Sequence, residues 1–323
     1  ERNNWIVALN ELKNKLVKIS REQTQLYKAP FVVKELLDMS AMPRIKVVTC
    51  AAVIDKTCIA MRFLECGLYM VNLNSQSMVA VGGETKNENQ TVRRLEYVEK
   101  EHLLVALAGP GKANDVWDRT INLIDGRDLK WIKLNDTRHC QAFAVGTGPA
   151  GATFLAAAVL SRIMLYEVIV TESKRHRRLG DMLMPEITQC LNWSEGALAV
   201  GYEHGFRIWN VVNVQKRSLI AALVNSEDIS LSFLGQSSYE AEMLIEISNH
   251  DRCEYLLVFS KCAVYVDRIG RRTRFIELIF PMITRKQHGF AYAAPYLSVY
   301  SENQVDVFNV INAEWMQTLN LRL

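Results

Sequence analysis

The chain has 323 residues, of which 49% are hydrophobic and 23% charged, a balance typical of a globular protein with a large core. Its net charge of +3 is too small to indicate a nucleic-acid-binding protein. Because no run of 18 apolar residues is present and the N-terminus lacks an apolar secretory stretch, we expect neither a transmembrane helix nor a signal peptide.

The first twenty residues predict an amphipathic helix. Trp5, Leu9, Leu12 and Leu16 recur at steps of three and four residues, which places them on one face of a helix. Residues 21–30 are polar and end in a proline, as linkers often do. We therefore expect a helix in residues 1–20, a linker in residues 21–30 and one large domain in residues 31–323.

From Phe31 onward the sequence repeats one short strand pattern six times. The repeated segments alternate apolar residues with others and are GLYMVNL (67–73), RTINLID (119–125), RIMLYEV (162–168), GFRIWNV (205–211), CAVYVDR (262–268) and QVDVFNV (304–310). Each contains Asn, Asp or Glu near its end, and these polar residues are Asn72, Asp125, Glu167, Asn210, Asp267 and Asn309. They recur every 42 to 57 residues, the period of β-propeller blades.

An apolar strand also precedes each repeated segment. In PYLSVYSENQVDVFNV (295–310), apolar residues alternate before and after a polar turn, which predicts a hairpin. Further apolar segments such as SMVAV, SLIAAL, RFIELIF and EWMQTLNL follow several repeats. We therefore predict an all-β fold, a β-propeller with six visible blades. A seventh blade would need strands from Phe31–Leu37 and from chain beyond Leu323.

Two features weigh on the question of catalysis. VGTGPAG (145–151) has the G-x-G-x-x-G spacing of dinucleotide-binding folds, but the following run is a strand of the third repeat, so we favour a turn between strands. The six histidines are scattered over different repeats without a nucleophile motif such as G-x-S-x-G. We expect no catalytic residue, cofactor or metal, and keep a hydrolase with its site in the central channel as the alternative.

The seven cysteines form no C-x-x-C motif and no zinc-like pairing with histidine. Cys50, Cys58, Cys190 and Cys262 lie within apolar, strand-like runs. We expect them to be reduced core thiols of a cytoplasmic protein.

Two basic clusters, SKRHRRLG (173–180) and DRIGRRTR (267–274), follow the third strands of their repeats. Both are predicted to lie in loops between strands three and four, which open on the same face of a propeller. One interpretation is that these are solvated turns. The other is a positively charged site for an acidic protein partner or an anionic membrane, formed by Lys174, Arg175, Arg177, Arg178, Arg268, Arg271, Arg272 and Arg274.

Two long segments resemble a known family. EYLLVFSKCAVYVDRIGRRTRFIELIFP (254–281) and APYLSVYSENQVDVFNVINAEWMQTL (294–319) are similar to the citron homology (CNH) domain. SKRHRRLGDMLMP and IDGRDLKWIKLNDTRHCQ resemble the subgroup of myotonic-dystrophy-kinase-related kinases known as MRCK or Genghis Khan. The resemblance covers about residues 24–323, with Phe280 in place of a usual tryptophan and an unusual insert, GPGKANDVWD.

The resemblance implies a seven-bladed propeller without catalytic residues of its own. It implies binding to a Rho-family GTPase, an adaptor or another protein, within a serine/threonine kinase that regulates actin and myosin downstream of such a GTPase. The expected helix around Trp5 resembles the last helix of the pleckstrin homology (PH) domain that precedes CNH in these kinases. We accordingly expect a cytoplasmic interaction module that is recruited to the membrane or cell cortex.

Overall fold

A computed structural model describes 17 stretches of the chain between Phe31 and Asn320. They are residues 31, 37, 48–63, 67–81, 90–110, 120–125, 131–148, 151–169, 175–194, 196–203, 205–211, 218–224, 228–235, 239–249, 252–280, 289–301 and 304–320. The predicted helix of residues 1–20, the linker of residues 21–30 and most of the GPGKANDVWD insert lie outside them.

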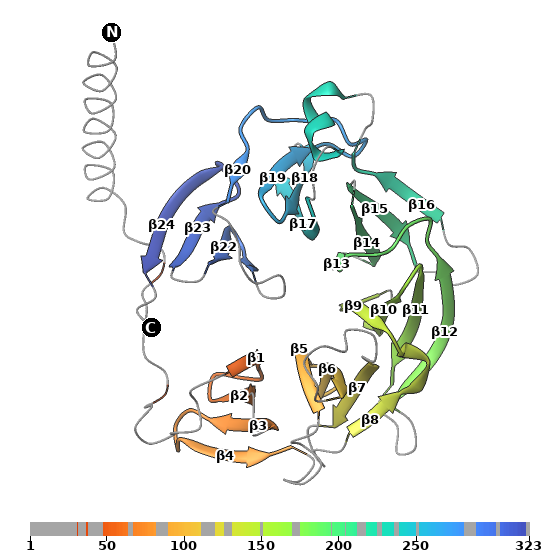
Figure 1. Ribbon diagram of the computed structural model, residues 1–323, viewed down its shortest axis with the longest axis vertical. Coiled ribbons are helices and arrows are strands. Elements are labelled where there is room, and N and C mark those ends of the chain that lie inside the picture. Colours follow the sequence, from red (N-terminus) through yellow and green to blue (C-terminus); the bar gives the residue numbers. More distant parts are fainter. Residues whose placement is uncertain are drawn as a thin grey trace.

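The described strands form six four-stranded antiparallel sheets arranged around a ring, with the first strand of each sheet toward the centre and the fourth at the rim (Figure 1). The first blade contains β1 (Val48–Val53), β2 (Cys58–Phe63), β3 (Gly67–Asn72) and β4 (Ser77–Ala80). The second contains β5 (Gln90–Val98), β6 (Leu103–Pro110), β7 (Thr120–Asp125) and β8 (Trp131–Leu134). The third contains β9 (Cys140–Thr147), β10 (Thr153–Val159), β11 (Arg162–Val168) and β12 (His176–Leu183). The fourth blade contains β13 (Cys190–Ser194), β14 (Ala197–Tyr202), β15 (Gly205–Asn210) and β16 (Ser218–Ala222). The fifth contains β17 (Ala241–Asn249), β18 (Arg252–Phe259), β19 (Cys262–Val266) and β20 (Leu278–Ile279). The sixth contains β21 (Phe290–Ala293), β22 (Tyr296–Tyr300), β23 (Gln304–Asn309) and β24 (Glu314–Asn320). The predicted β-propeller is confirmed, and each repeated segment provides the third strand of a blade. Short 3₁₀ helices, η2 (Asn135–Thr137) and η4 (Ile229–Gly235), lie between blades.

Buried apolar clusters join consecutive blades. Between the second and third blades, for example, Leu123, Phe143 and Leu155 are fully buried in one cluster. Equivalent clusters join the first and second, third and fourth, fourth and fifth, and fifth and sixth blades. Because close-packed interiors resist deformation, these interfaces hold the loops of the ring in fixed positions.

The polar residue near the end of the repeats has a structural role in three of them. The backbone N–H groups of Asn74 and Ser75 both donate to Asn72 Oδ1 at 3.0 Å. The side chains of Asp267 and Asn309 accept backbone hydrogen bonds in the same way. Short Asn and Asp side chains close such turns, which explains their recurrence after the third strand. Glu167 differs, because it lies within β11 opposite Arg177.

The glycine motif begins at the end of β9, and its described residues Gly148 and Gly151 lie in the connection to β10, as the turn interpretation predicts. The Gly148 N–H donates to the carbonyl of Ala152 at 2.8 Å, and the Gly151 N–H donates to the carbonyl of Gly148 at 3.2 Å. Gly151 has φ +72°, a left-handed conformation that favours glycine. At Gly146, a Cβ atom would lie 2.0 Å from Trp193 Cγ, so the glycine permits close blade packing.

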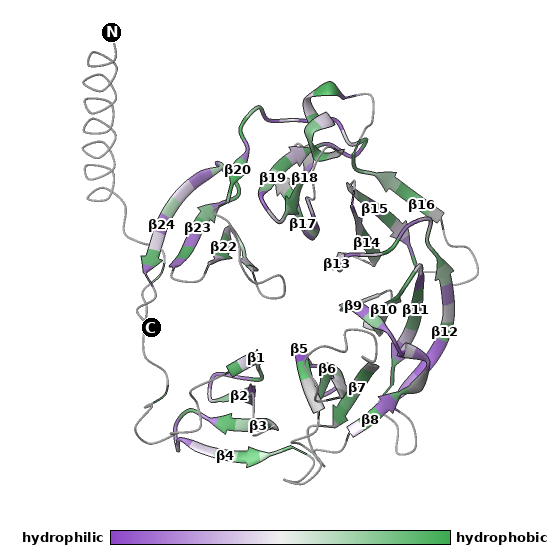
Figure 2. Cartoon of the chain, in the orientation of Figure 1, coloured by the Kyte–Doolittle hydropathy of each residue, from purple (hydrophilic) through white to green (hydrophobic). Residues whose placement is uncertain are grey.

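Two strand predictions were wrong. Arg177 and Arg178 do not lie in a loop but in β12, the rim strand of the third blade, whose polar character is visible in Figure 2. In RFIELIF, only Leu278 and Ile279 are in a strand. A rim strand is exposed on its outer side, so its sequence need not alternate strictly between apolar and polar residues.

Of the cysteines predicted to be core thiols, Cys50, Cys190 and Cys262 are buried and free, whereas Cys58 is only partly buried. Burial raises the pKa of Cys50 to about 11 and that of Cys262 to about 12. These thiols therefore stay protonated and unreactive at neutral pH.

The described residues contain no seventh four-stranded sheet, but one segment contacts both the sixth and the first blade. The Phe31 N–H donates to Gln317 Oε1 at 3.1 Å, and Gln317 Nε2 donates to the Phe31 carbonyl at 2.7 Å. The Phe31 ring also lies edge-on to Tyr296, with 5.4 Å between ring centroids. Leu37 packs against the cluster of Phe63, Tyr69 and Val71 on the first blade. Phe31 and Leu37 thus contact the two blades that no described blade-to-blade cluster joins.

We expect Gln317→Ala to lower the free energy of unfolding by about 1–2 kcal/mol, because it removes both hydrogen bonds to the Phe31 backbone. Glu314→Ala, on the exposed start of the same strand, is the control and should change stability by less than about 0.5 kcal/mol. Urea unfolding measures both variants. Equal stability of the two would contradict a role for Gln317 in holding the ring together.

Candidate interaction surface

The connection between β19 and β20, residues 267–277, projects apolar side chains into solvent; we call it the blade-5 loop. Phe275 is 96% exposed, and Ile269 and Ile276 in the same loop are also exposed. Ile229 of η4 is 87% exposed, and η4 contacts the loop. Exposed apolar side chains gathered in one place are uncommon on a monomeric surface and mark interaction sites.

Arg272 holds the loop in its shape. Its side chain donates from Nε to the Arg274 carbonyl at 2.8 Å and from Nη2 to the Phe275 carbonyl at 3.1 Å. It also forms an ion pair with Glu277 at 2.8 Å and donates to the Ser230 carbonyl at 3.3 Å. Because its donors are engaged inside the protein, Arg272 fixes the position of Phe275 instead of facing a partner.

Arg274 fastens the loop to two blades. Its guanidinium forms a bidentate ion pair with Glu254 of β18, at 3.0 Å from Nε to Oε1 and 2.5 Å from Nη2 to Oε2. It lies 4.1 Å from the centroid of the Tyr265 ring, and Nη1 donates to the Ile311 carbonyl after β23 at 2.7 Å. Arg274 therefore connects the fifth and sixth blades at the base of the loop.

η4 is attached to the same loop through Asp228. The Arg272 backbone N–H donates to Asp228 Oδ2 at 3.0 Å, while the Ser230 side chain and backbone donate to Oδ1. These hydrogen bonds, led by the one from the Ser230 side chain, lower the pKa of Asp228 below its usual value. The carboxylate therefore stays charged and keeps Ile229 beside the blade-5 loop.

The cations exposed on the loop are Arg268 and Arg271. The Arg271 backbone is held by Asp267, while its guanidinium has no ion-pair partner among the residues that the structure describes. Of the four arginines predicted as contacts in this cluster, Arg272 and Arg274 are therefore used internally, and Arg268 and Arg271 point to the outside of the fold.

The other predicted cluster is largely neutralised by carboxylates. Arg177 forms an ion pair with Glu167 on the neighbouring strand β11. Arg178 pairs with Asp136 and with Asp181, both at 2.9 Å. These exposed pairs contribute little to stability, but they lower the net positive charge of the rim.

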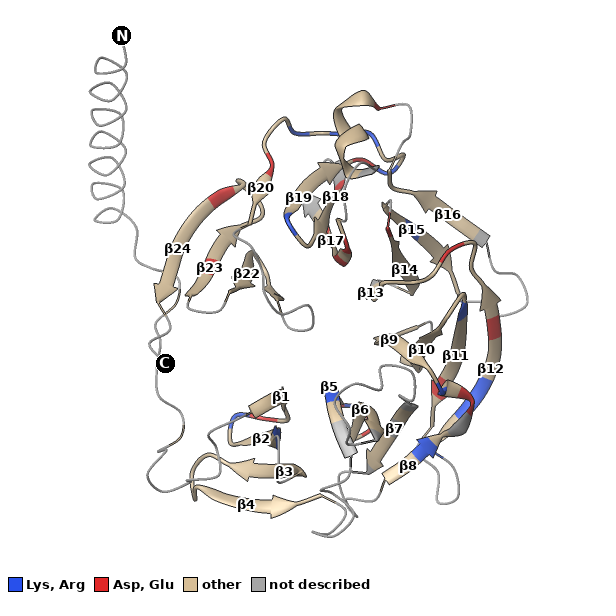
Figure 3. Ribbon diagram, viewed as in Figure 1, with Lys and Arg blue, Asp and Glu red and all other residues tan. Residues whose placement is uncertain are grey.

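The two clusters lie at separate places around the ring, with the fourth blade between them (Figure 3). Arg175 lies in the bend before β12, and Lys174 is outside the described residues. Both connections, 169–175 and 267–277, join a third strand to a fourth strand. Since strands alternate in direction, the third strands β11 and β19 end on the same face of the ring.

Among the residues that the structure describes, no three His, Cys, Asp or Glu side chains lie close enough together to hold a metal ion. No described helix has the length and apolarity needed to cross a bilayer.

A ring of four-stranded antiparallel blades with chemically distinctive loops defines a β-propeller of the kind that presents binding surfaces. The family model described as "CNH domain" matches residues 64–323, and the chain belongs to the CNH domain family. CNH domains are regulatory and protein-interaction modules.

The relatives are serine/threonine kinases. The chain is 41% identical, over its whole length, to the "Serine/threonine-protein kinase mrck-1" of Caenorhabditis elegans, of which it covers 20%. It is 32% identical to "Serine/threonine-protein kinase MRCK alpha" and 33% identical to MRCK beta of Homo sapiens, covering all of this chain and 17% and 18% of those proteins. The matched part of these relatives is the CNH domain, and their kinase domain lies outside this chain.

A solved structure shows the same fold. The "AfRom2 CNH domain" aligns with a TM-score of 0.62 at 17% sequence identity, over 85% of this chain and 84% of that one. At this identity the comparison supports the propeller fold alone.

Proposed function

We propose that this domain recruits a serine/threonine kinase by docking a protein partner on the blade-5 loop. Phe275 is the anchor that a partner buries, and Arg268 and Arg271 are the charged contacts around it. The observation that carries this proposal is the almost complete exposure of Phe275 on a loop that two arginines hold in place. Aromatic and arginine residues dominate binding energy at protein interfaces, and a loop already held in its bound shape loses little entropy on docking.

The proposed partner is a Rho-family GTPase, and the parent kinase regulates actin and myosin downstream of it. The relatives support a serine/threonine kinase as the parent protein, since all those named above are MRCK kinases, and the family resemblance of the sequence suggests the GTPase. The domain would act in the cytoplasm and be brought to the cell cortex by its partner. We extend the proposed surface to Arg175, in the bend before β12, and to Arg177 and Arg178, at the start of that rim strand.

An anionic membrane is the second candidate partner. The blade-5 loop combines apolar side chains with Arg268 and Arg271, as peripheral membrane-binding segments do. The PH-like helix of residues 1–20 remains a separate proposal.

We expect Phe275→Ala to weaken partner binding at least about tenfold, as loss of a buried aromatic anchor does. Arg271→Glu should also weaken binding and reduce its dependence on salt, because exposed charges are screened by ions. The measurement is binding of the domain to nucleotide-loaded Rho-family GTPases and, separately, to vesicles containing phosphatidylserine.

Val79→Ala on β4 is the control, since Val79 is exposed on a different blade. Unchanged GTPase binding by Phe275→Ala would reject this docking site. Binding to vesicles without binding to any GTPase would show that the loop docks on the membrane and not on a GTPase.

A further inference from the structure

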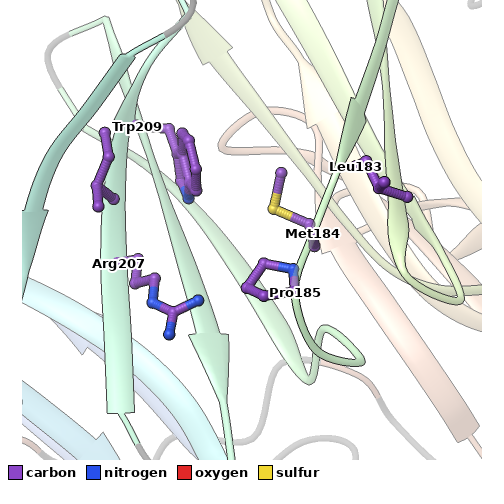
Figure 4. A pocket seen from close by; sticks show the side chains of 6 residues that line it. Leu183, Met184, Pro185, Arg207 and Trp209 are labelled. Carbon is purple, nitrogen blue, oxygen red and sulfur yellow. The ribbon is translucent and has the colours of Figure 1, made fainter.

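A pocket of about 380 Å³ opens at the rim between the third and fourth blades; we call it the rim pocket. It is lined by Leu183, Met184, Pro185, Arg207, Trp209 and Leu219. Figure 4 shows Arg207 and Trp209 on one wall, facing Met184 and Pro185 on the other. The pocket is formed by β12 with the chain after it, and by β15 and β16, so it is separate from the blade-5 loop.

The surroundings of the rim pocket are strongly apolar. Leu183 is 74% exposed and Leu219 is 47% exposed, although both line the pocket. Ile187, on the connection after β12, and Ile220, next to Leu219 on β16, are also exposed. Burying these side chains against a partner removes apolar surface from water, which favours binding.

Arg207 gives the pocket one positive charge. Its guanidinium lies 5.1 Å from the centroid of the Tyr202 ring, which holds it in place. Among the described residues it forms an ion pair with Glu186, at 3.4 Å, and about a third of each side chain is exposed. Such an exposed pair is weak, so a ligand carboxylate can take the place of Glu186 at small cost.

The strand that borders the pocket has no strand paired to its outer edge among the described residues. β16 is the outermost strand of its sheet, and Leu219 to Ala222 carry no charge. The rim strands β12 and β24 do carry charged residues, which discourage pairing with another chain. An uncharged rim strand beside an apolar pocket is suited to an extended peptide, whose alternate side chains point into the pocket.

We propose that the rim pocket binds an extended peptide segment of a partner protein. An aliphatic or aromatic side chain of the peptide enters between Pro185 and Leu219, and an acidic residue next to it pairs with Arg207. The apolar walls of the pocket favour the aliphatic or aromatic side chain, and the guanidinium of Arg207 favours the acidic residue. Trp209 and Arg207 lie two residues apart on β15, and these two residue types dominate peptide and protein interfaces. The proposal is independent of the blade-5 loop.

The test is selection of a phage-displayed library of random twelve-residue peptides on the whole chain. We expect enriched peptides to share an apolar residue followed within two positions by Asp or Glu. A synthetic copy should bind in a fluorescence polarisation titration, and Leu219→Glu should weaken binding at least about tenfold. Leu183→Glu should act in the same way, and both side chains are exposed enough for folding to survive.

A double-mutant cycle locates the acidic residue of the peptide. Arg207→Gln should weaken binding about fivefold to tenfold, and changing the peptide's acid to its amide should then cost nothing more. The control is Val79→Glu on β4, an uncharged rim strand of another blade, which should bind normally.

Two outcomes would overturn the proposal. One is that no enriched peptide saturates the wild-type chain below 1 mM. The other is that enriched peptides bind Leu219→Glu and Leu183→Glu as tightly as they bind the wild type.

Discussion

Arg274→Ala should lower the free energy of unfolding by about 3 kcal/mol, the largest effect of any substitution in the blade-5 loop. The change leaves the mostly buried Glu254 carboxylate without its bidentate partner, and removing one member of a buried pair is costly. It also leaves the Ile311 carbonyl unpaired and removes the contact with Tyr265. Urea unfolding followed by circular dichroism measures the loss.

Two further variants sharpen this prediction. Arg274→Lys should recover little stability, because an ammonium group cannot make the bidentate contact. Arg271→Ala, in the same loop but exposed, should change stability by less than about 0.5 kcal/mol. Equal stabilities for Arg274→Ala and Arg271→Ala would show that Arg274 does not fasten the loop to the blades.

The second large effect is expected in the core between the fourth and fifth blades. Phe259 is fully buried there, and its ring contacts Phe206 edge-on with 5.6 Å between centroids. Phe259→Ala should destabilise the domain by about 3–5 kcal/mol, since it removes a large side chain and leaves a cavity.

Phe275→Ala provides the matched control, because it is the same substitution at a 96% exposed position. Its stability should lie within about 0.5 kcal/mol of the wild type. Thermal unfolding of both variants makes the comparison. A similar loss at both positions would contradict the placement of Phe259 in the interface between blades.

The sequence could predict those parts of the fold whose burial gives a recognisable pattern of apolar residues. The second and third strands lie within the blades and are covered on both faces, so their apolar residues stand out, and Asn72, Asp267 and Asn309 mark the turns that follow. β12 has two exposed arginines and a glycine, so its sequence resembles a loop. The contact of Phe31 with Gln317 joins residues 286 positions apart, a separation that no local pattern can reveal.

For the candidate site, the charge cluster in the sequence pointed to the loop that carries the exposed Phe275, but it did not reveal the roles of Arg272 and Arg274. Arg272 and Arg274 resemble surface cations in sequence, and only their neighbours in space, Glu277 and Glu254, show that they are internal braces. Phe275 is the first apolar residue of RFIELIF (274–280), so the sequence pattern predicts that it lies in a strand. Arg272 binds the Phe275 carbonyl and keeps that residue in the loop. The sequence feature that could have indicated an interaction site is the aromatic Phe275 directly after the basic cluster of residues 267–274.

The most direct test of the central claim, that the braced blade-5 loop presents Phe275 to a partner, is photo-crosslinking from position 275. Benzoylphenylalanine would replace Phe275 in one variant and Val79 in another, and each would be irradiated with GTP-analogue-loaded Rho-family GTPases. The account predicts a covalent adduct from position 275 with one of these GTPases, competed by unlabelled wild-type domain, and none from position 79. A GTPase that binds the domain but forms no adduct from position 275, or forms one from position 79, would contradict it.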